Sequence, residues 1–167
     1  MVGVAYGQLA DLAPIFGVWA LPKVGGEGAR YAAFENELIE AMEALKPGRM
    51  VLEAPLSFQA LLGVSTMKVM AQQLTLRGIA YAEAWRASIP IMEISSDSVR
   101  LAILGQSRFA KGTVKGEVMR YCRDRGLKVP DDNAADAVLT WLWFRGQLTG
   151  ARTARAGPLF VERETLQ

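Results

Sequence analysis

Carboxylates are the side chains of this sequence best placed to do chemistry, because its 167 residues include no histidine and one cysteine. Without histidine the chain lacks the usual general base, the usual zinc ligand and the Ser–His and Cys–His nucleophile systems. A single cysteine, Cys122, excludes both a disulfide framework and a thiolate metal cluster. We therefore expect any chemistry to use carboxylates, lysine or a hydroxyl group.

Two of these carboxylates lie on one face of the last predicted helix. Asp132 and Asp136 are four residues apart, and Asp136 heads the apolar run that begins at Ala137. Helix capping explains Asp131 or Asp132, but it explains Asp136 poorly because that residue lies a full turn inside the helix. Carboxylates on one face repel unless protons or cations neutralise them. In a chain without histidine, Mg²⁺ or Mn²⁺ held by oxygen ligands is the natural neutraliser.

Glu53 is a third candidate, because it follows the short apolar run Met50-Val51-Leu52. Such a run is typical of a strand buried on both faces. Open α/β sheets bind ligands at the carboxyl ends of their strands, which favours a role for Glu53 in a site. The alternative interpretation is a charge at a strand end that points into water.

Basic residues gather in the segment that precedes the acidic helix. One interpretation is a solvated helix face, and the other is a surface that follows a phosphate backbone. The position of the segment directly before the acidic helix favours the second. The residues are Arg108, Lys111, Lys115, Arg120, Arg123, Arg125 and Lys128.

The hydrophobic pattern predicts the elements that position these residues. Short β-branched and aromatic runs indicate strands, and apolar residues at helical spacing indicate helices. Two strands followed by alternating helices and strands predict an α/β fold with a mixed sheet. The predicted strands are Val2–Tyr6, Ile15–Leu21, Met50–Leu52 and Ile89–Ile94, and the predicted helices are Ala29–Leu45, a helix capped by Ser65 or Thr66 that runs to Ser88, Asp97–Leu104 capped by Ser96, Thr113–Arg125 and Asp132–Gln147.

Length and composition predict one domain over residues 1–150, followed by a loosely ordered basic tail over 151–167. A hydrophobic fraction of 51% and a charged fraction of 22% exclude a disordered chain. The net charge of +2 is too small to indicate nucleic-acid binding by itself. The sequence contains no signal-peptide pattern and no apolar run long enough to cross a bilayer. Together with the single cysteine, these features predict a cytoplasmic protein.

The order of the motifs resembles the RuvC-type Holliday-junction resolvases, particularly their phage-like relatives, over about residues 4 to 147. The motifs that carry the resemblance are Leu52-Glu53-Ala54-Pro55, the segment from Lys111 to Lys115, and Asp131 to Ala137. The resemblance implies a ribonuclease H-like mixed sheet flanked by helices. It also implies a homodimer that binds branched DNA and cuts four-way junctions by two-metal hydrolysis, with two Mg²⁺ ions or with Mn²⁺ in their place.

The resemblance also implies roles for individual residues. Glu53, Asp132 and Asp136 would hold the metal ions, with Asp131 as a substitute for Asp132. Lys115 would act in catalysis by neutralising charge on the attacked phosphate. The predicted DNA-binding residues are Phe58, which resembles the aromatic residue that probes the junction, together with Arg108, Lys111, Lys115 and Arg120.

The N-terminus departs from the pattern of the family. Residues 1–7 match the second strand of the family, so we expect the first strand and its catalytic Asp to be missing from this chain. Either the start is assigned at an internal codon or the chain is a degenerate copy. The alternative function is then a catalytically silent module that binds junctions or has a structural role. A nuclease for other branched or RNA–DNA substrates would share the same fold and acids.

Overall fold

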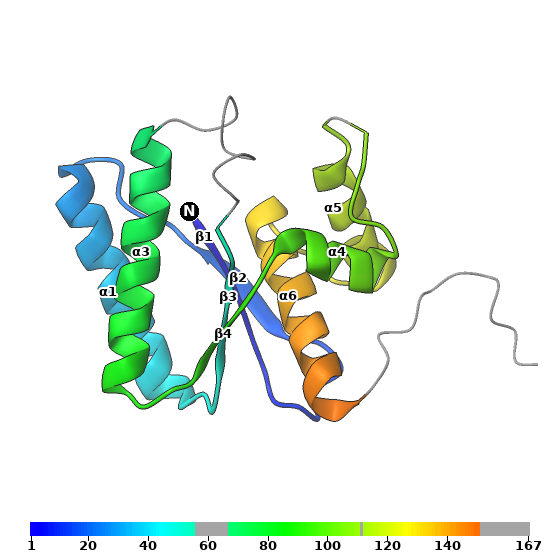
Figure 1. The fold of residues 1–167 in the computed structure, drawn as a ribbon, viewed down its shortest axis with the longest axis horizontal. Helices are drawn as coiled ribbons and strands as arrows, with labels where there is room; N and C mark the ends of the chain where they lie inside the picture. Colours follow the sequence, from blue (N-terminus) through cyan, green and yellow to red (C-terminus); the bar gives the residue numbers. More distant parts are fainter. Residues whose placement is uncertain (56–66, 111, 151–167) are drawn as a thin grey trace, which may run out of the picture.

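A computed structural model of the chain describes residues 1–55, 67–110 and 112–150. Helices and strands alternate after an initial pair of strands, as the hydrophobic pattern predicts (Figure 1). The elements are β1 (Val2–Tyr6), β2 (Ile15–Trp19), α1 (Gly26–Leu45), β3 (Met50–Glu53), α3 (Met67–Arg86), β4 (Ile91–Ile94), α4 (Ser96–Leu104), α5 (Val114–Asp124) and α6 (Asp132–Thr149).

The strands form two hydrogen-bonded pairs. β1 and β2 are antiparallel, with Val2 opposite Trp19 and Tyr6 opposite Ile15. β3 and β4 are parallel, with Glu53 opposite Ile94. Among the described residues no backbone ladder joins one pair to the other. Both strand orientations of the predicted mixed sheet are therefore present, in two separate ladders.

Helices cover the strands on two sides. α1 and α3 pack together on one side, and α6 lies on the other with α4 and α5 beside it (Figure 1). The first side is filled by Phe34, Leu38 and Met42 of α1 with Ala80 of α3. The core of the second side is formed by Val99, Ile103, Val118, Cys122, Ala135, Val138 and Leu139.

A glycine lets β1 lie directly against the start of α6. A Cβ atom added at Gly3 would come within 1.9 Å of the Asn133 carbonyl oxygen, so no larger residue fits there without a backbone shift. This close approach brings the first turns of α6, and the acids on them, next to the strands.

The predicted elements are confirmed, with differences at their ends. β2 ends at Trp19 and β4 begins at Ile91. Ser95 caps α4, not Ser96 as predicted: its side chain accepts a hydrogen bond from the Ser98 N–H. The strand Met50–Leu52 is half-buried, whereas the sequence predicts burial on both faces. Its exposure follows from the cavity beside it, which is described below.

Some predictions fall on residues outside the described ranges. They concern the helix cap at Ser65 or Thr66, the side chains of Phe58 and Lys111, and the tail over 151–167. Within the described residues, no helix combines the length and the apolar character that a membrane crossing requires.

Candidate functional site

The candidate site lies where three elements meet. β3 and β4 are parallel, so their carboxyl ends lie at the same edge, and the Ala54 N–H donates to the Ile94 carbonyl oxygen at 2.8 Å. Glu53 therefore lies beside the first turn of α4, which follows β4. Asp136 of α6 lines the same cavity as Glu53, Ser96 and Arg100. The structure thus brings Glu53 and Asp136 together from distant parts of the sequence.

Burial and neighbouring charges raise the pKa of both carboxyl groups. Loss of water around the Glu53 carboxyl raises its pKa, although the residue as a whole is exposed. The Asp136 charge also raises this pKa, whereas the Ser96 hydroxyl and the Arg100 guanidinium lower it. Burial likewise raises the pKa of Asp136; Arg100 opposes the shift and Asp132 adds to it. A carboxyl group whose pKa is raised by burial and by a neighbouring carboxylate is one that a bound cation would stabilise in its charged form.

Arg100 is a member of the site that the sequence analysis missed. Its Nη2 atom lies 3.5 Å from Asp136 Oδ1 and its Nη1 atom lies 3.8 Å from Asp97 Oδ1. Its Nε atom is buried without a hydrogen-bond partner among the described residues. The available signal is spacing: Ser96 and Arg100 are four residues apart at the start of a helix that follows a strand, so they share one face.

Asp131 and Asp132 have different roles at the start of α6. Asp131 is the N-cap, and its Oδ1 atom accepts from the Ala134 N–H at 2.9 Å. Burial acts to raise the pKa of Asp131, but the hydrogen bonds from Ala134 and Asn133 outweigh it and lower that pKa. Asp132 forms an ion pair with Lys115 of α5, which raises the pKa of this lysine. Asp131 is therefore engaged in capping, and Asp132 faces a cation.

The donor set fits one hard cation better than two. Magnesium in proteins is commonly held by one or two carboxylates together with substrate phosphates and water. Glu53 and Asp136 supply such a pair. The described residues include no cluster of three or more acids that could hold a metal ion. Asp132 is directed to Lys115 instead. The structure thus brings together two of the three predicted metal ligands.

The other predicted basic residues lie on the surface near α5. The Lys115 side chain is 73% exposed, although it forms an ion pair with Asp132. Arg120 pairs with Glu117 one turn earlier on the same helix, and Arg108 is exposed in the loop before α5. α5 lies on the side of the molecule opposite α1 (Figure 1).

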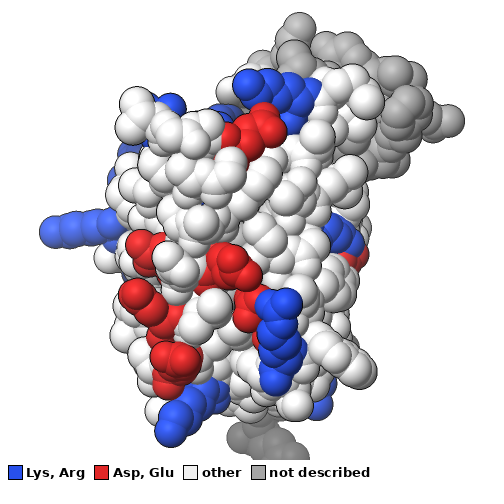
Figure 2. Space-filling model, turned by 90° about the vertical axis from the view of Figure 1, so that its left-hand side faces the viewer, with Lys and Arg blue, Asp and Glu red and all other residues white. Residues whose placement is uncertain are grey.

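The face that carries α1 and α3 differs in charge from the surface near α5. Figure 2, which views this side, shows acidic side chains gathered over part of the surface, with basic ones around them. The outward positions of α1 include Glu37, Glu40 and Glu43. A polyanion such as DNA would therefore meet less favourable charge on this face than along α5.

Comparison with known proteins supports the resemblance predicted from the motifs. No family model matches the chain. The crossover junction endodeoxyribonuclease RuvC of Synechococcus sp. (strain RCC307) is 27% identical over 122 residues, which cover 72% of this chain and 73% of that protein. The solved structure of Thermus thermophilus RuvC superimposes with a TM-score of 0.59 at 16% identity, covering 89% of this chain and 87% of that one.

A second solved structure, T. thermophilus RuvC in complex with Holliday junction substrate, has a TM-score of 0.56 at 14% identity, over 83% of this chain and 82% of that one. The similarity to RuvC thus extends over most of the described elements. The resemblance to the RuvC-type resolvases is confirmed, and the chain has the ribonuclease H-like fold of RuvC.

Proposed function

We propose that the protein is a structure-selective DNA endonuclease that cuts four-way junctions in a metal-dependent reaction. The observation that carries the proposal is the pair formed by Glu53 and Asp136, which line one cavity and whose pKa values are both raised by burial. The junction specificity is taken from the similarity to RuvC, one structure of which is titled as a complex with Holliday junction substrate.

In this proposal Glu53 and Asp136 hold Mg²⁺, or Mn²⁺ in its place. When bound there, such a metal would supply Lewis-acid chemistry, lowering the pKa of water and stabilising charge on a phosphate. Arg100 orients Asp136 through the contact between Nη2 and Oδ1 at 3.5 Å. Lys115 lies next to the acids with an exposed ammonium group, where it can neutralise charge on a bound phosphate.

A second metal ion, as two-metal hydrolysis requires, needs further carboxylates. Asp132 can supply one if the phosphate backbone replaces it as the partner of Lys115. The resemblance predicts another, an Asp on a strand ahead of Val2. The two-metal form of the mechanism therefore needs a carboxylate in addition to Glu53, Asp132 and Asp136.

The DNA in this proposal lies along α5 and the start of α6. Exposed cations such as Lys115, Arg108 and Arg120 are suited to phosphate contacts, which contribute most of the non-specific affinity for DNA. The acidic residues on α1 disfavour DNA on the opposite side of the molecule (Figure 2).

The proposed active form is a homodimer, because two sites are needed to cut two strands symmetrically. The surface of α3 offers exposed apolar side chains on one face: Leu74, Tyr81 and Trp85, of which Trp85 is 85% exposed. These residues are spaced by seven and four positions, which places them along one side of the helix.

A second candidate function is a catalytically silent module that binds junctions or serves a structural role. Its support is that Arg100 and Lys115 already neutralise Asp136 and Asp132. In addition, the described residues contain no three-acid cluster suited to a metal. Such a protein would retain the cationic surface of α5 and bind branched DNA without cutting it.

Cleavage of a synthetic four-way junction in Mg²⁺ distinguishes the two candidates. The assay compares this chain with a version extended by an apolar strand that contains one Asp, and linear duplex of the same sequence serves as the control substrate. Symmetric cuts in the junction by the extended protein support the endonuclease. Tight junction binding by both proteins, with no cutting by either, supports the silent module.

A further inference from the structure

The cavity that Glu53 and Asp136 line has a volume of about 940 Å³ and is bordered by every residue of β1 and β3. α6 contributes one of its faces to this cavity. The residues on that face recur at intervals of three and four, which is the spacing of one side of an α-helix. They begin at Asn133, continue through Asp136, Ala137, Thr140 and Trp141, and end at Arg145. The face that meets the cavity therefore starts with Asn133 and not with Asp132.

Asp132 lies on the other side of Asp136. Successive residues of an α-helix are about 100° apart around its axis. Asn133 is therefore displaced from Asp136 toward Ala137, and Asp132 is displaced the opposite way. Asp132 does not line the cavity, and it forms an ion pair with Lys115 of α5. Of these two neighbours in the first turn of α6, Asn133 is the one that shares the cavity with Glu53 and Asp136.

Contacts of its backbone and its side chain hold Asn133 in place. Its carbonyl oxygen lies against β1, 1.9 Å from the position that a Cβ atom of Gly3 would take. Its side-chain Nδ2 atom donates to Asp131 Oδ2 at 3.2 Å, and Asp131 is itself fixed as the N-cap of α6. The acceptor of the side chain, Oδ1, is at the other end of the amide group. Carbonyl oxygens of this kind are suitable ligands for Mg²⁺ and Mn²⁺.

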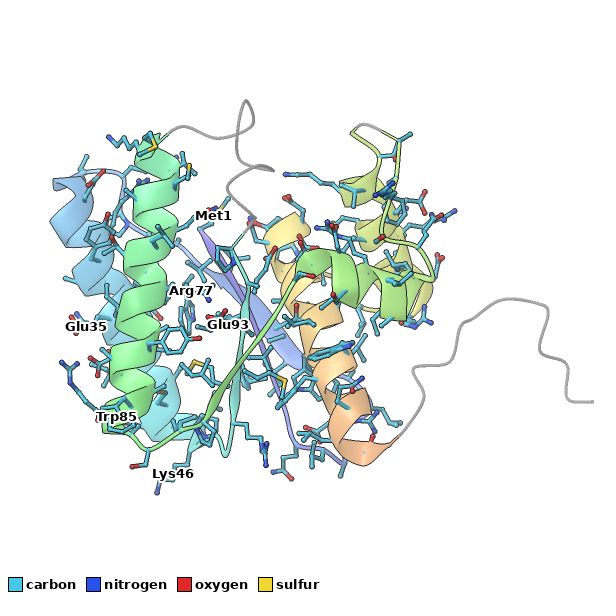
Figure 3. All side chains as sticks on the ribbon, viewed as in Figure 1. Met1, Glu35, Lys46, Arg77, Trp85 and Glu93 are labelled. Carbon is cyan, nitrogen blue, oxygen red and sulfur yellow. The ribbon has the colours of Figure 1, made fainter. Side chains whose placement is uncertain are left out.

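The site is short of negative charge. Among the described residues, the carboxylates that line the cavity are those of Glu53 and Asp136, and the Arg100 guanidinium lies 3.5 Å from Asp136. Arg77 also lines the cavity, but it extends from α3 toward Glu93 of β4, with which it forms an ion pair (Figure 3). Two carboxylates and one guanidinium leave a net charge of −1 to face a divalent cation. The amide in the first turn of α6 adds no charge to this balance.

We infer that Asn133 is the third oxygen donor of this site, and that its neutral amide leaves the free protein with a weak cation site. A carboxylate at this position would supply one more negative charge within a few ångströms of the cation, where the attraction is strong. Asparagine supplies the ligand atom without that charge. The inference rests on the proposed function in taking a divalent cation as the occupant. It concerns cation binding by the free protein and makes no use of DNA cleavage.

Two variants of the full chain test this assignment. Asn133→Asp adds a carboxylate on the cavity face, and the same change combined with Asp132→Asn moves a carboxylate there at constant net charge. An acid in the first turn of a helix complements its dipole, so we expect both variants to fold, which thermal midpoints in EDTA check. Mn²⁺ binding without DNA is measured from the loss of the EPR signal of the free ion. Both variants should bind Mn²⁺ at least about tenfold more tightly than the unchanged protein.

The unchanged protein provides a second measurement that does not depend on the folding of a variant. A Mg²⁺ titration followed by NMR should shift the side-chain amide signals of Asn133 and leave those of Asn36, an exposed residue of α1, in place. Static Asn133 signals, no gain in Mn²⁺ affinity, or a gain in the single variant alone would overturn the inference. Failure of the proposed function would be seen separately, as the absence of junction cleavage by proteins that bind Mn²⁺.

Discussion

At the scale of single residues, the sequence predicted the type of chemistry at the site better than it predicted which side chains are in contact there. The absence of histidine from the sequence and the position of Asp136 inside a helix predicted a carboxylate site. In the structure Asp136 and Glu53 line the same cavity. The contact of Arg100 with Asp136 could not be predicted because the two residues lie on different helices; the spacing of Ser96 and Arg100 indicates only that they share a face. The choice between Ser95 and Ser96 as a cap depends on a shift of one residue, which propensity does not resolve.

The cap at Asp131 leads to the first prediction at this scale. Asp131→Ala should lower the free energy of unfolding by about 0.5–2 kcal/mol, because it removes the acceptor for the Ala134 N–H. Asp131→Asn is the control, since its amide oxygen can still cap. Chemical denaturation of the three proteins gives the comparison, and equal losses for Ala and Asn would contradict the capping role.

The pH dependence of this difference follows from the lowered pKa of Asp131. A depressed pKa in the folded state contributes stability that is present above the ordinary value of about 3.9. This stability is lost as the pH falls through the lower, folded-state pKa. The destabilisation by Asp131→Ala should therefore be constant near neutral pH and shrink in strong acid. A difference that grew on acidification would be inconsistent with the sign of the shift.

The single cysteine gives the second prediction at this scale. Cys122 is fully buried in the core, and burial raises the pKa of its thiol to about 11. Its thiolate fraction at pH 8 should be ~100-fold lower than that of an ordinary thiol, and the reagent must also reach it. A thiol-reactive dye should label the native protein slowly and the denatured protein rapidly. Rapid labelling under native conditions would contradict the packing of α5 against α6.

At the scale of elements, periodicity predicted every described helix and strand, because each carries a clear apolar pattern. The burial of β3 was not predicted correctly. An apolar run such as Met50-Val51-Leu52 is typical of a strand with neighbours on both sides, and here one side of β3 faces the cavity that β1 also lines. The apolar pattern of β3 thus predicts a second neighbouring strand, and among the described residues β3 pairs only with β4.

The basic helix α5 gives a prediction at this scale. Lys115→Ala combined with Arg120→Ala should weaken binding to branched DNA and make the slope of log affinity against log salt shallower by about one to two units, because fewer phosphates are neutralised. Lys46→Asn is a matched control on the α1 side, since asparagine tolerates the positive φ of 45° found there. An unchanged slope in the double variant would indicate that α5 is only a solvated face.

At the scale of the whole molecule, the similarity to RuvC gives the fold, while the assembly is a proposal. Two strand pairs lie between two helical layers, with exposed cations near α5 in one layer and exposed glutamates on α1 in the other. The exposed face of α3 could not be predicted from composition, because it depends on which surfaces remain uncovered after folding.

The exposed face of α3 predicts self-association. Trp85→Glu should shift the protein toward the monomer in sedimentation experiments, because it places a charge where the proposed dimer buries an aromatic ring. Glu37→Gln on α1 is a control that changes one charge at an exposed position outside the proposed interface. A monomer before the substitution, or a dimer that resists it, would exclude this face as the interface.

The central claim is that Glu53 and Asp136 form the metal-dependent centre of a junction nuclease. The most direct measurement is the cleavage rate of a four-way junction in Mg²⁺ by the strand-extended protein, its Asp136→Asn variant and its Asp97→Asn variant. Asp97 also lies beside Arg100 but is 75% exposed, so it is a matched carboxylate outside the pair. The account predicts that Asp136→Asn abolishes cleavage and retains junction binding, while Asp97→Asn cuts nearly normally. Undiminished cleavage by Asp136→Asn would contradict it.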